Sequence, residues 1–481
     1  MEEGSNGVEK TNKIEALSVE TDGVKIQAHE HVVNSAHTVD HDSWEQVGLL
    51  LVTGFNCGYI LSFSNLMLVP LGWSWGIVCL VVVGAFTWYA NWLLAGFHII
   101  DGRRFIRYRD LMGFVFGRKM YYVTWVLQFF TLLLGNMGFI LLGGRALKVC
   151  MLNTTYVYRG SVGCSINCTI TQCSDLLPQA INSEFSSSPL RLQVFILITG
   201  AVFFIFAFVV PTMSAMRSWL AASTILTITY IAILLAIIVK DGRNNNTRDY
   251  NISGNKAEKV LNAFGAIATI LVCNTGGLLP EIQSTLRKPA IKNMRKALLL
   301  QYTIGLAFYY GVSIVGYWAY GSSVSEYIPN ELSGPKWAKV LTNASVFLQT
   351  IIAQHMFIIP IHEALDTKLL KLDQSMHSKV NFKRLLGLRA LLFSLNTFVT
   401  AMFPFMGDFV NLFGSFTLFP LTFVFPSMIF IQIKGKTAKR EEMVWHWANI
   451  VVSSLLAIIT TAAAFRSIIN NARAYSFFAD T

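Results

Sequence analysis

Apolar runs long enough to cross a lipid bilayer recur along this sequence, and they constrain its fold more than any other feature. Only 14% of the residues are charged, about half the share usual in soluble domains. A membrane helix needs about 20 mostly apolar residues, and these runs do not alternate with polar residues as the strands of an outer-membrane barrel do. We count eleven, near residues 46–69, 74–97, 120–146, 191–212, 217–239, 260–285, 297–320, 338–361, 385–403, 409–431 and 445–465.

The sequence therefore predicts an all-α membrane protein with eleven transmembrane helices. Residues 1–43 are polar, and we expect a disordered cytoplasmic tail there without a cleavable signal. Ser43 and Gln46 have the spacing of a capping box, which starts the first helix. The last span and an outer C-terminal tail occupy residues 433–481.

Basic residues predict how the chain is oriented, because loops rich in Lys and Arg stay on the cytoplasmic side. The loops 98–119, 213–218, 286–297, 363–386 and 432–443 together hold 21 basic residues, and the loops that alternate with them hold 10. The first set and the N-terminus are predicted to be cytoplasmic. An odd number of spans then places the C-terminus outside the cell.

Two of the loops assigned to the outside carry possible glycosylation sites. Asn153, Asn167, Asn245 and Asn251 each begin an Asn-x-Ser/Thr triplet. A fifth triplet begins at Asn343 within a span and is predicted to be silent.

The long outer loop, 147–190, also collects cysteines. Cys150, Cys164, Cys168 and Cys173 lie in or beside it. On an oxidising side of the membrane they can form disulfides in any of three pairings, and a zinc site is the alternative reading. We predict no metal site and no organic cofactor.

Two spans contain glycine-rich interruptions at mid-depth. The first span contains Thr53, Gly54, Phe55, Asn56, Cys57 and Gly58, and the sixth contains Cys273, Asn274, Thr275, Gly276 and Gly277. Irregular backbone at this depth is tolerated only where it is buried in protein or lines a cavity. Glycine also occurs in membrane helices for packing, but two breaks at matching positions favour a pocket.

The breaks lie at spans n and n+5, so they divide the chain into two halves of five helices. The first half is 44–239 and the second is 240–432. Because each half has an odd number of helices, the second is inverted relative to the first. Broken helices at matching positions of inverted repeats are typical of secondary transporters.

Broken helices suit a zwitterionic ligand. Unpaired N–H groups beginning near Cys57 favour a carboxylate, and unpaired carbonyl groups near Thr53 and Cys273 favour an ammonium group. Asn56 and Asn274 can add neutral hydrogen bonds. We therefore expect a small zwitterionic solute in contact with Thr53–Gly58 and with Cys273–Gly276.

Several motifs resemble the plant proline and compatible-solute transporters of the amino acid/auxin permease family. They include Asn274-Thr275-Gly276 followed by Leu279-Pro280-Glu281-Ile282-Gln283, and Gly316-Tyr317-Trp318-Ala319-Tyr320-Gly321. The resemblance extends from about residue 41 to the end. It implies a five-plus-five, LeuT-like fold and proton-coupled uptake of proline at the plasma membrane, with glycine betaine or 4-aminobutyrate as further substrates.

The resemblance suggests protons as the coupling ion, and a proton carrier should be an ionisable group at membrane depth. Three candidates are His355 in the eighth span, Glu281 after the sixth-span break and Asp408 between the ninth and tenth spans. Each has a structural alternative. His355 can be a neutral interhelical histidine, Glu281 can pair with Arg287 or with a loop arginine as an inner gate, and Asp408 can cap a helix or form an outer gate.

Other functions remain open. A broad neutral amino-acid permease is the alternative within the same class, and a substrate-sensing membrane receptor is the main alternative from another class. A channel would show rings of charge or filter loops, and an enzyme would need clustered catalytic groups. We expect no enzymatic activity, no nucleic acid partner and no protein partner.

Overall fold

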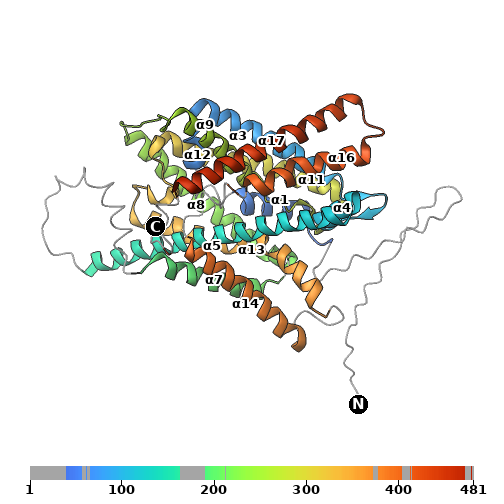
Figure 1. Ribbon diagram of the computed structural model, residues 1–481. Coiled ribbons are helices and arrows are strands. Elements are labelled where there is room, and N and C mark those ends of the chain that lie inside the picture. Colours follow the sequence, from blue (N-terminus) through green and yellow to red (C-terminus); the bar gives the residue numbers. More distant parts are fainter. Residues whose placement is uncertain are drawn as a thin grey trace, which may run out of the picture.

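The computed structural model describes residues 40–56, 65–162, 190–211, 213–371, 378–403 and 414–471, together with residues 61, 412 and 478. Within these residues the regular elements are helices and one short hairpin, β1 (Ile99–Ile100) with β2 (Arg103–Arg104), and loops connect them. In Figure 1, α5 and α13 run through the middle, with α3, α9 and α17 on one side and α7 and α14 on the other.

The first five predicted spans correspond to α1 (Trp44–Leu51) with η1 (Val52–Asn56), α3 (Gly72–Ala95), α5 (Arg118–Val162), α7 (Leu192–Val209) and α8 (Arg217–Asn244). The next three correspond to α9 (Lys256–Asn274) with α10 (Leu279–Ser284), α11 (Ala290–Leu300) with η3 (Gln301–Gly305) and α12 (Leu306–Tyr320), and α13 (Lys336–Leu369). The last three correspond to α14 (Lys379–Met402), η6 (Gly414–Leu418) with η7 (Pro420–Val424) and α16 (Phe425–Lys434), and α17 (Arg440–Asn471).

Ten of these segments are long and apolar enough to cross a membrane. The first predicted span starts at the expected capping box, in which Gln46 N–H donates to Ser43 and Ser43 N–H donates to Gln46. It continues beyond η1 outside the described residues, so the count of eleven stays a prediction.

Burial divides the helices into an inner and an outer set. In an apolar stretch of 18 residues of α13, 78% is buried, whereas 22% of the corresponding stretch of α17 is buried. Large apolar side chains such as Val81, Ile225 and Ile458 are exposed on the outer helices. Exposed apolar faces of this extent suit lipid rather than water, and they leave α13 and α5 to carry the polar interior.

Hydrogen bonds and an ion pair join segments that were predicted to lie on the same side of the membrane. At one end, the N-terminal segment joins the sixth span through His41 N–H and Thr285 O (2.8 Å), and Arg104 pairs with Asp40 (2.5 Å). At the other end, Ser322 N–H donates to Asp249 O (2.7 Å). Each of these contacts joins segments of the same predicted set, and which end faces the cytoplasm stays a prediction.

One boundary differs from the sequence analysis. Helix α5 continues to Val162, whereas the outer loop was predicted to begin at residue 147. Cys150 therefore lies on a helix, with its sulfur 3.9 Å from Val340 O, and the residues directly after it, Met151 and Leu152, are strong helix formers. Cys164, Cys168 and Cys173 lie outside the described residues, so the disulfide pairings stay untested.

Candidate functional site

The sixth span is broken where the sequence predicted. Helix α9 ends at Asn274, the chain is extended at Thr275 (φ −155°, ψ 151°), and α10 begins at Leu279. Gly277 has φ +68°, a conformation that glycine adopts without steric cost. Pro280 lies in the first turn of α10, where a missing N–H group breaks no helical hydrogen bond.

Side chains from neighbouring helices satisfy the backbone carbonyls at this break. The Asn274 carbonyl accepts from Gln301 Nε2 (3.3 Å) and from Tyr302 OH (3.2 Å). The Gly277 carbonyl accepts from Gln128 Nε2 (2.8 Å) on α5. The break is therefore a supported part of the fold, as buried polar backbone requires.

A small cavity of about 30 Å³ opens beside the break. This volume is about the share of one water molecule in the liquid. Its polar groups include Thr275, Thr131 and Thr417, and the hydroxyl of Thr131 donates to that of Thr417 (2.7 Å). Its walls come from α5, the break, α13 and η6, and they comprise Thr131, Leu134, Gly135, Val272, Thr275, Gly276, Phe357, Gly414, Thr417 and Leu418.

The first-span element departs from α-helical geometry where its break was predicted. Residues 52–56 form the π-helical turn η1, a feature found frequently at functional sites, and η1 contacts both α9 and α13. Thr53 is buried, and its carbonyl accepts from Gln349 Nε2 (3.0 Å). Gly54 lies against Met356, while the side chains of Phe55 and Asn56 and all of Cys57 and Gly58 lie outside the described residues.

The predicted site residues of the sixth span separate into two groups. Thr275 and Gly276 line the cavity. Cys273 and Asn274 are fully buried, and Asn274 Nδ2 donates to Tyr310 OH (3.3 Å). The Asn274 side chain therefore bonds α12 beside the break, and its contact with substrate stays a prediction.

Sequence reasoning missed Thr131, Thr417 and Gln128. Each is a polar residue within an apolar run, and Gln128 and Thr131 are three residues apart, so they lie on one face of α5. That spacing was visible in the sequence. Their partners lie 149 and 286 residues away, which the sequence did not reveal.

The candidate proton carriers fall in three places. His355 is fully buried in α13, and its ring lies edge-on to Phe206 (5.2 Å between centroids). Glu281 lies in α10, and Asp408 is outside the described residues. Their role in proton coupling stays a prediction.

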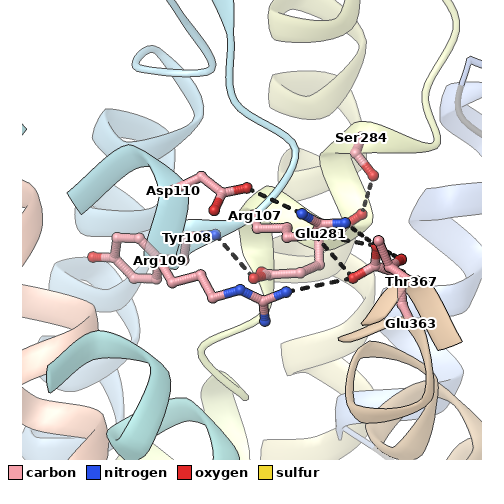
Figure 2. A network of polar contacts seen from close by, with 8 residues as sticks. All are labelled: Arg107, Tyr108, Arg109, Asp110, Glu281, Ser284, Glu363 and Thr367. Atoms are coloured by element: carbon pink, nitrogen blue, oxygen red, sulfur yellow. Dashed lines mark hydrogen bonds and ion pairs between the residues drawn. The ribbon is translucent and has the colours of Figure 1, made fainter. Parts of the chain in front are cut away.

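Glu281 takes part in a polar network at the end of the bundle that holds the N-terminal segment (Figure 2). Its Oε1 accepts from Tyr108 N–H (2.9 Å) at the start of α4 (Tyr108–Phe116) and from Gln128 Nε2 (3.1 Å). Arg287, the alternative partner named above, instead donates to His41 O (3.0 Å). Glu281 therefore caps α4 rather than pairing with Arg287.

Glu363 of α13 is the acidic centre of the same network. Arg107 Nε lies 3.1 and 3.0 Å from its two carboxylate oxygens, Arg107 Nη2 also donates to it, and Arg109 Nη2 lies 3.7 Å away. Burial raises the pKa of Asp110 above its ordinary value, although Arg107 and Arg109 oppose that shift. Loop 98–119 is thereby joined to α10 and α13, as Figure 2 shows.

The possible glycosylation sites differ in accessibility. Asn251 is exposed, whereas Asn245 is half-buried and its Nδ2 donates to Ala319 O (3.1 Å). Asn343 is fully buried and accepts from Tyr327 OH (2.7 Å). The side chain of Asn153 and the whole of Asn167 lie outside the described residues.

Comparison with known proteins gives the same class as the architecture. The model of the family "transmembrane amino acid transporter protein" matches residues 40–466. The chain is 29% identical over 455 residues to GABA transporter 1 of Arabidopsis thaliana, covering 89% of this chain and 93% of that protein. It is 25% identical over 421 residues to lysine histidine transporter-like 1 of the same plant, covering 85% and 84%.

A solved structure shares the fold. The crystal structure of MhsT in complex with L-phenylalanine superposes with a TM-score of 0.57 at 10% sequence identity, covering 89% of this chain and all of that one. At this identity the likeness shows the fold alone. It supports the predicted LeuT-like architecture, and the repeat boundaries stay predictions.

Proposed function

Because this chain belongs to the family of transmembrane amino acid transporters, we propose that it takes up a small zwitterionic amino acid together with protons. Proline is the main proposed substrate, and glycine betaine and 4-aminobutyrate are further proposed substrates. A broad neutral amino-acid permease is the second candidate. The family and the fold are those of transporters, so no enzymatic activity is assigned.

The observation that carries the proposal is the cavity beside the broken sixth span. Thr275 and Gly276 present non-helical backbone to it, and Thr131 and Thr417 add hydroxyl groups. These groups are hydrogen-bonding but uncharged, so they suit a ligand whose two charges cancel. A cavity of about 30 Å³ must widen to hold an amino acid, which makes substrate binding part of a conformational cycle.

The residues that line the cavity and the names of the relatives both bear on the choice of substrate. Phe357 and Leu134 restrict the cavity on its apolar sides. One relative is named for 4-aminobutyrate and others for lysine and histidine, so substrate choice varies among similar chains. The uncharged lining of the cavity favours proline or 4-aminobutyrate over cationic amino acids.

In the proposed cycle, substrate and proton enter from outside, one group of helices rocks around the site, and both leave to the cytoplasm. The network of Arg107, Glu281 and Glu363 closes the end predicted to be cytoplasmic. Among the described residues, Glu281 Oε2 is buried and has no hydrogen-bond partner. It is therefore a position that can take up a proton, and His355 is the second candidate.

Uptake by proteoliposomes tests the substrate. We expect labelled proline to accumulate, with competition by glycine betaine and 4-aminobutyrate and weaker competition by alanine and histidine. Thr131→Val removes a cavity hydroxyl at nearly constant volume and should raise the apparent KM for proline about tenfold. Thr229→Val is the matched control, because Thr229 is a half-buried threonine on α8 whose hydroxyl donates to Ile225 O of its own helix.

Two results would contradict this assignment. Equal competition by all neutral amino acids would favour the broad permease, and saturable binding without accumulation would favour a receptor. An unchanged KM in Thr131→Val would separate the cavity from substrate binding.

Proton coupling needs its own measurement. Uptake should be faster at an outer pH of about 5 than at about 7.5, and a protonophore should abolish the difference. Glu281→Gln should retain substrate exchange but lose the proton-driven accumulation. An unchanged rate at both pH values would exclude coupling to protons.

Location at the plasma membrane, with a cytoplasmic N-terminus and an extracellular C-terminus, completes the proposal. The segregation of the loops at two ends supports the relative placement of these regions. Antibody access to tags at residue 1 and residue 481 in unpermeabilised cells tests it, since only the C-terminal tag should be accessible.

A further inference from the structure

A second and larger cavity lies away from the substrate site. It measures about 410 Å³ and is bounded by α3, α11, α16 and α17. These elements border the predicted cytoplasmic loops 98–119, 286–297 and 432–443, so the cavity is at the predicted cytoplasmic surface of the bilayer. Its volume is in the range of small-molecule sites.

The cavity combines aromatic side chains with charges of both signs. Trp92 and Trp445 line it and are 40% and 46% exposed, as tryptophans at the membrane–water interface commonly are. Arg295 and Lys434 contribute two positive charges, and Glu441 and Glu442 contribute two negative charges. The lining is therefore neutral in total, which does not favour a lipid with net negative charge.

The Arg295 side chain is positioned by its neighbours, and part of its hydrogen-bonding capacity is unsatisfied. Its guanidinium lies over the Trp92 ring, 3.7 Å from the ring centroid, and its Nη2 lies close to Gly96. Its Nε is buried and has no hydrogen-bond partner among the described residues. Because Nε is buried while Arg295 lines the cavity, the terminal nitrogens of the guanidinium are the donors for a phosphate oxygen.

We propose that this cavity binds the headgroup of phosphatidylethanolamine from the cytoplasmic leaflet. The phosphate lies between Arg295 and Lys434, and the ammonium group lies at Glu441 and Glu442. The acyl chains leave past the partly exposed side chains of Trp92 and Trp445. Basic side chains between membrane helices are known to bind lipid headgroups, and the two carboxylates here add acceptors for a headgroup that also carries an amine.

The aromatic faces argue against phosphatidylcholine. A quaternary ammonium group would need open aromatic faces. Arg295 lies over the Trp92 ring, Trp445 is stacked with Phe86 at 5.9 Å between centroids, and the Phe430 ring is stacked on His446 at 3.9 Å. Tyr89 is also stacked with His446. The carboxylates thus remain as the amine-binding groups, and they can accept hydrogen bonds from a primary ammonium but not from choline.

Native mass spectrometry of the purified full-length protein tests the proposal, because lipid adducts differ in mass. We titrate with phosphatidylethanolamine, phosphatidylcholine and phosphatidylglycerol of matched chain length. Phosphatidylethanolamine should bind about tenfold more tightly than either of the others. Glycerophosphoethanolamine, which has the headgroup without acyl chains, should bind weakly, and equal binding would identify a soluble phosphate ester as the ligand and contradict the proposal.

Substitutions test which side chains bind the phosphate and which bind the ammonium group. Arg295→Gln should weaken phosphatidylethanolamine binding about tenfold, and Lys292→Gln is the matched control on the exposed face of the same helix. The double variant Glu441→Gln, Glu442→Gln should bind phosphatidylethanolamine and phosphatidylcholine equally. Unchanged binding in Arg295→Gln, or unchanged discrimination in the double variant, would overturn the proposal.

Two further measurements keep the test decisive. If Arg295→Gln does not purify as a folded protein, Arg295→Lys retains the charge but loses the planar contact with Trp92, and it should bind phosphatidylethanolamine several-fold more weakly. A second copy of the protein instead of lipid adducts would assign the cavity to an interface and refute lipid binding. The readout is binding, so it does not depend on which amino acid is transported.

Discussion

Glu363→Gln is the sharpest test of the proposed cytoplasmic gate. The carboxylate accepts from Arg107 with two oxygens and lies 3.7 Å from Arg109, and its side chain is 13% exposed. A net contribution of about 2 kcal/mol is reasonable for a charged hydrogen-bonding group of this burial. If the network exists only while this end is closed, its loss shifts the equilibrium toward the open form about thirtyfold.

Modification of Cys273 measures that shift. The chain has seven cysteines, and replacing the other six with serine leaves Cys273, which is fully buried at the break. A small membrane-permeant thiol reagent should then modify Cys273 about thirtyfold faster in Glu363→Gln than in its parent. Substrate that stabilises the closed form should slow the reaction in both.

Asp110→Asn is the matched control. Asp110 also contacts Arg107, but at 3.5 Å and with a side chain that is 29% exposed. A half-buried pair with one contact at this distance contributes less than about 1 kcal/mol, so the rate should change less than fivefold. If Glu363→Gln reacts no faster than its parent while keeping the same unfolding temperature, the network is structural and does not act as a gate.

Three further predictions concern stability, the break and glycosylation. Burial and Arg104 lower the pKa of His98 to about 4. The unfolded chain therefore binds more protons between pH 6.5 and 4, and stability should fall by about 3 kcal/mol as the pH falls through that range. Thermal melts should show a weaker pH dependence in His98→Gln than in the parent. Gly277→Ala should destabilise the protein by about 1 kcal/mol and slow uptake, because φ is +68° there, and equal melting temperature with equal uptake would contradict this. Asn251→Gln should remove a glycan-dependent mobility shift that Asn245→Gln leaves in place, and the reverse pattern would show that accessibility does not select the site.

The sequence predicted the features that depend on local composition. Spans follow from runs of apolar residues, and the break at 275–278 follows from Thr275, two glycines and Pro280 in succession. The segregation of basic loops follows from the cost of moving charge across the bilayer. These properties are encoded in neighbouring residues, so a single sequence reveals them.

Features that depend on pairing between distant segments were not predicted. Arg107 and Glu363 are 256 residues apart, and each alone has the appearance of an ordinary charge near a loop. The hydrogen bond between Asn274 and Tyr310 was also not predicted, because the position of Asn274 beside the break does not indicate on which side Tyr310 lies. Composition shows that a polar group is present at membrane depth, whereas only packing determines whether it meets ligand or protein.

Gln128 connects the two regions that the transport cycle must coordinate. Its Nε2 donates to the Gly277 carbonyl at the break and to Glu281 in the gate network, at 2.8 and 3.1 Å. Glu281 in turn holds the first N–H group of α4, beside Arg107. A movement of the break that displaces the Gly277 carbonyl therefore weakens one of the bonds that Gln128 shares. Since both bonds use one amide group, a change in the geometry of the break is transmitted to the network around Glu281, and the proposed transport cycle requires coupling of this kind.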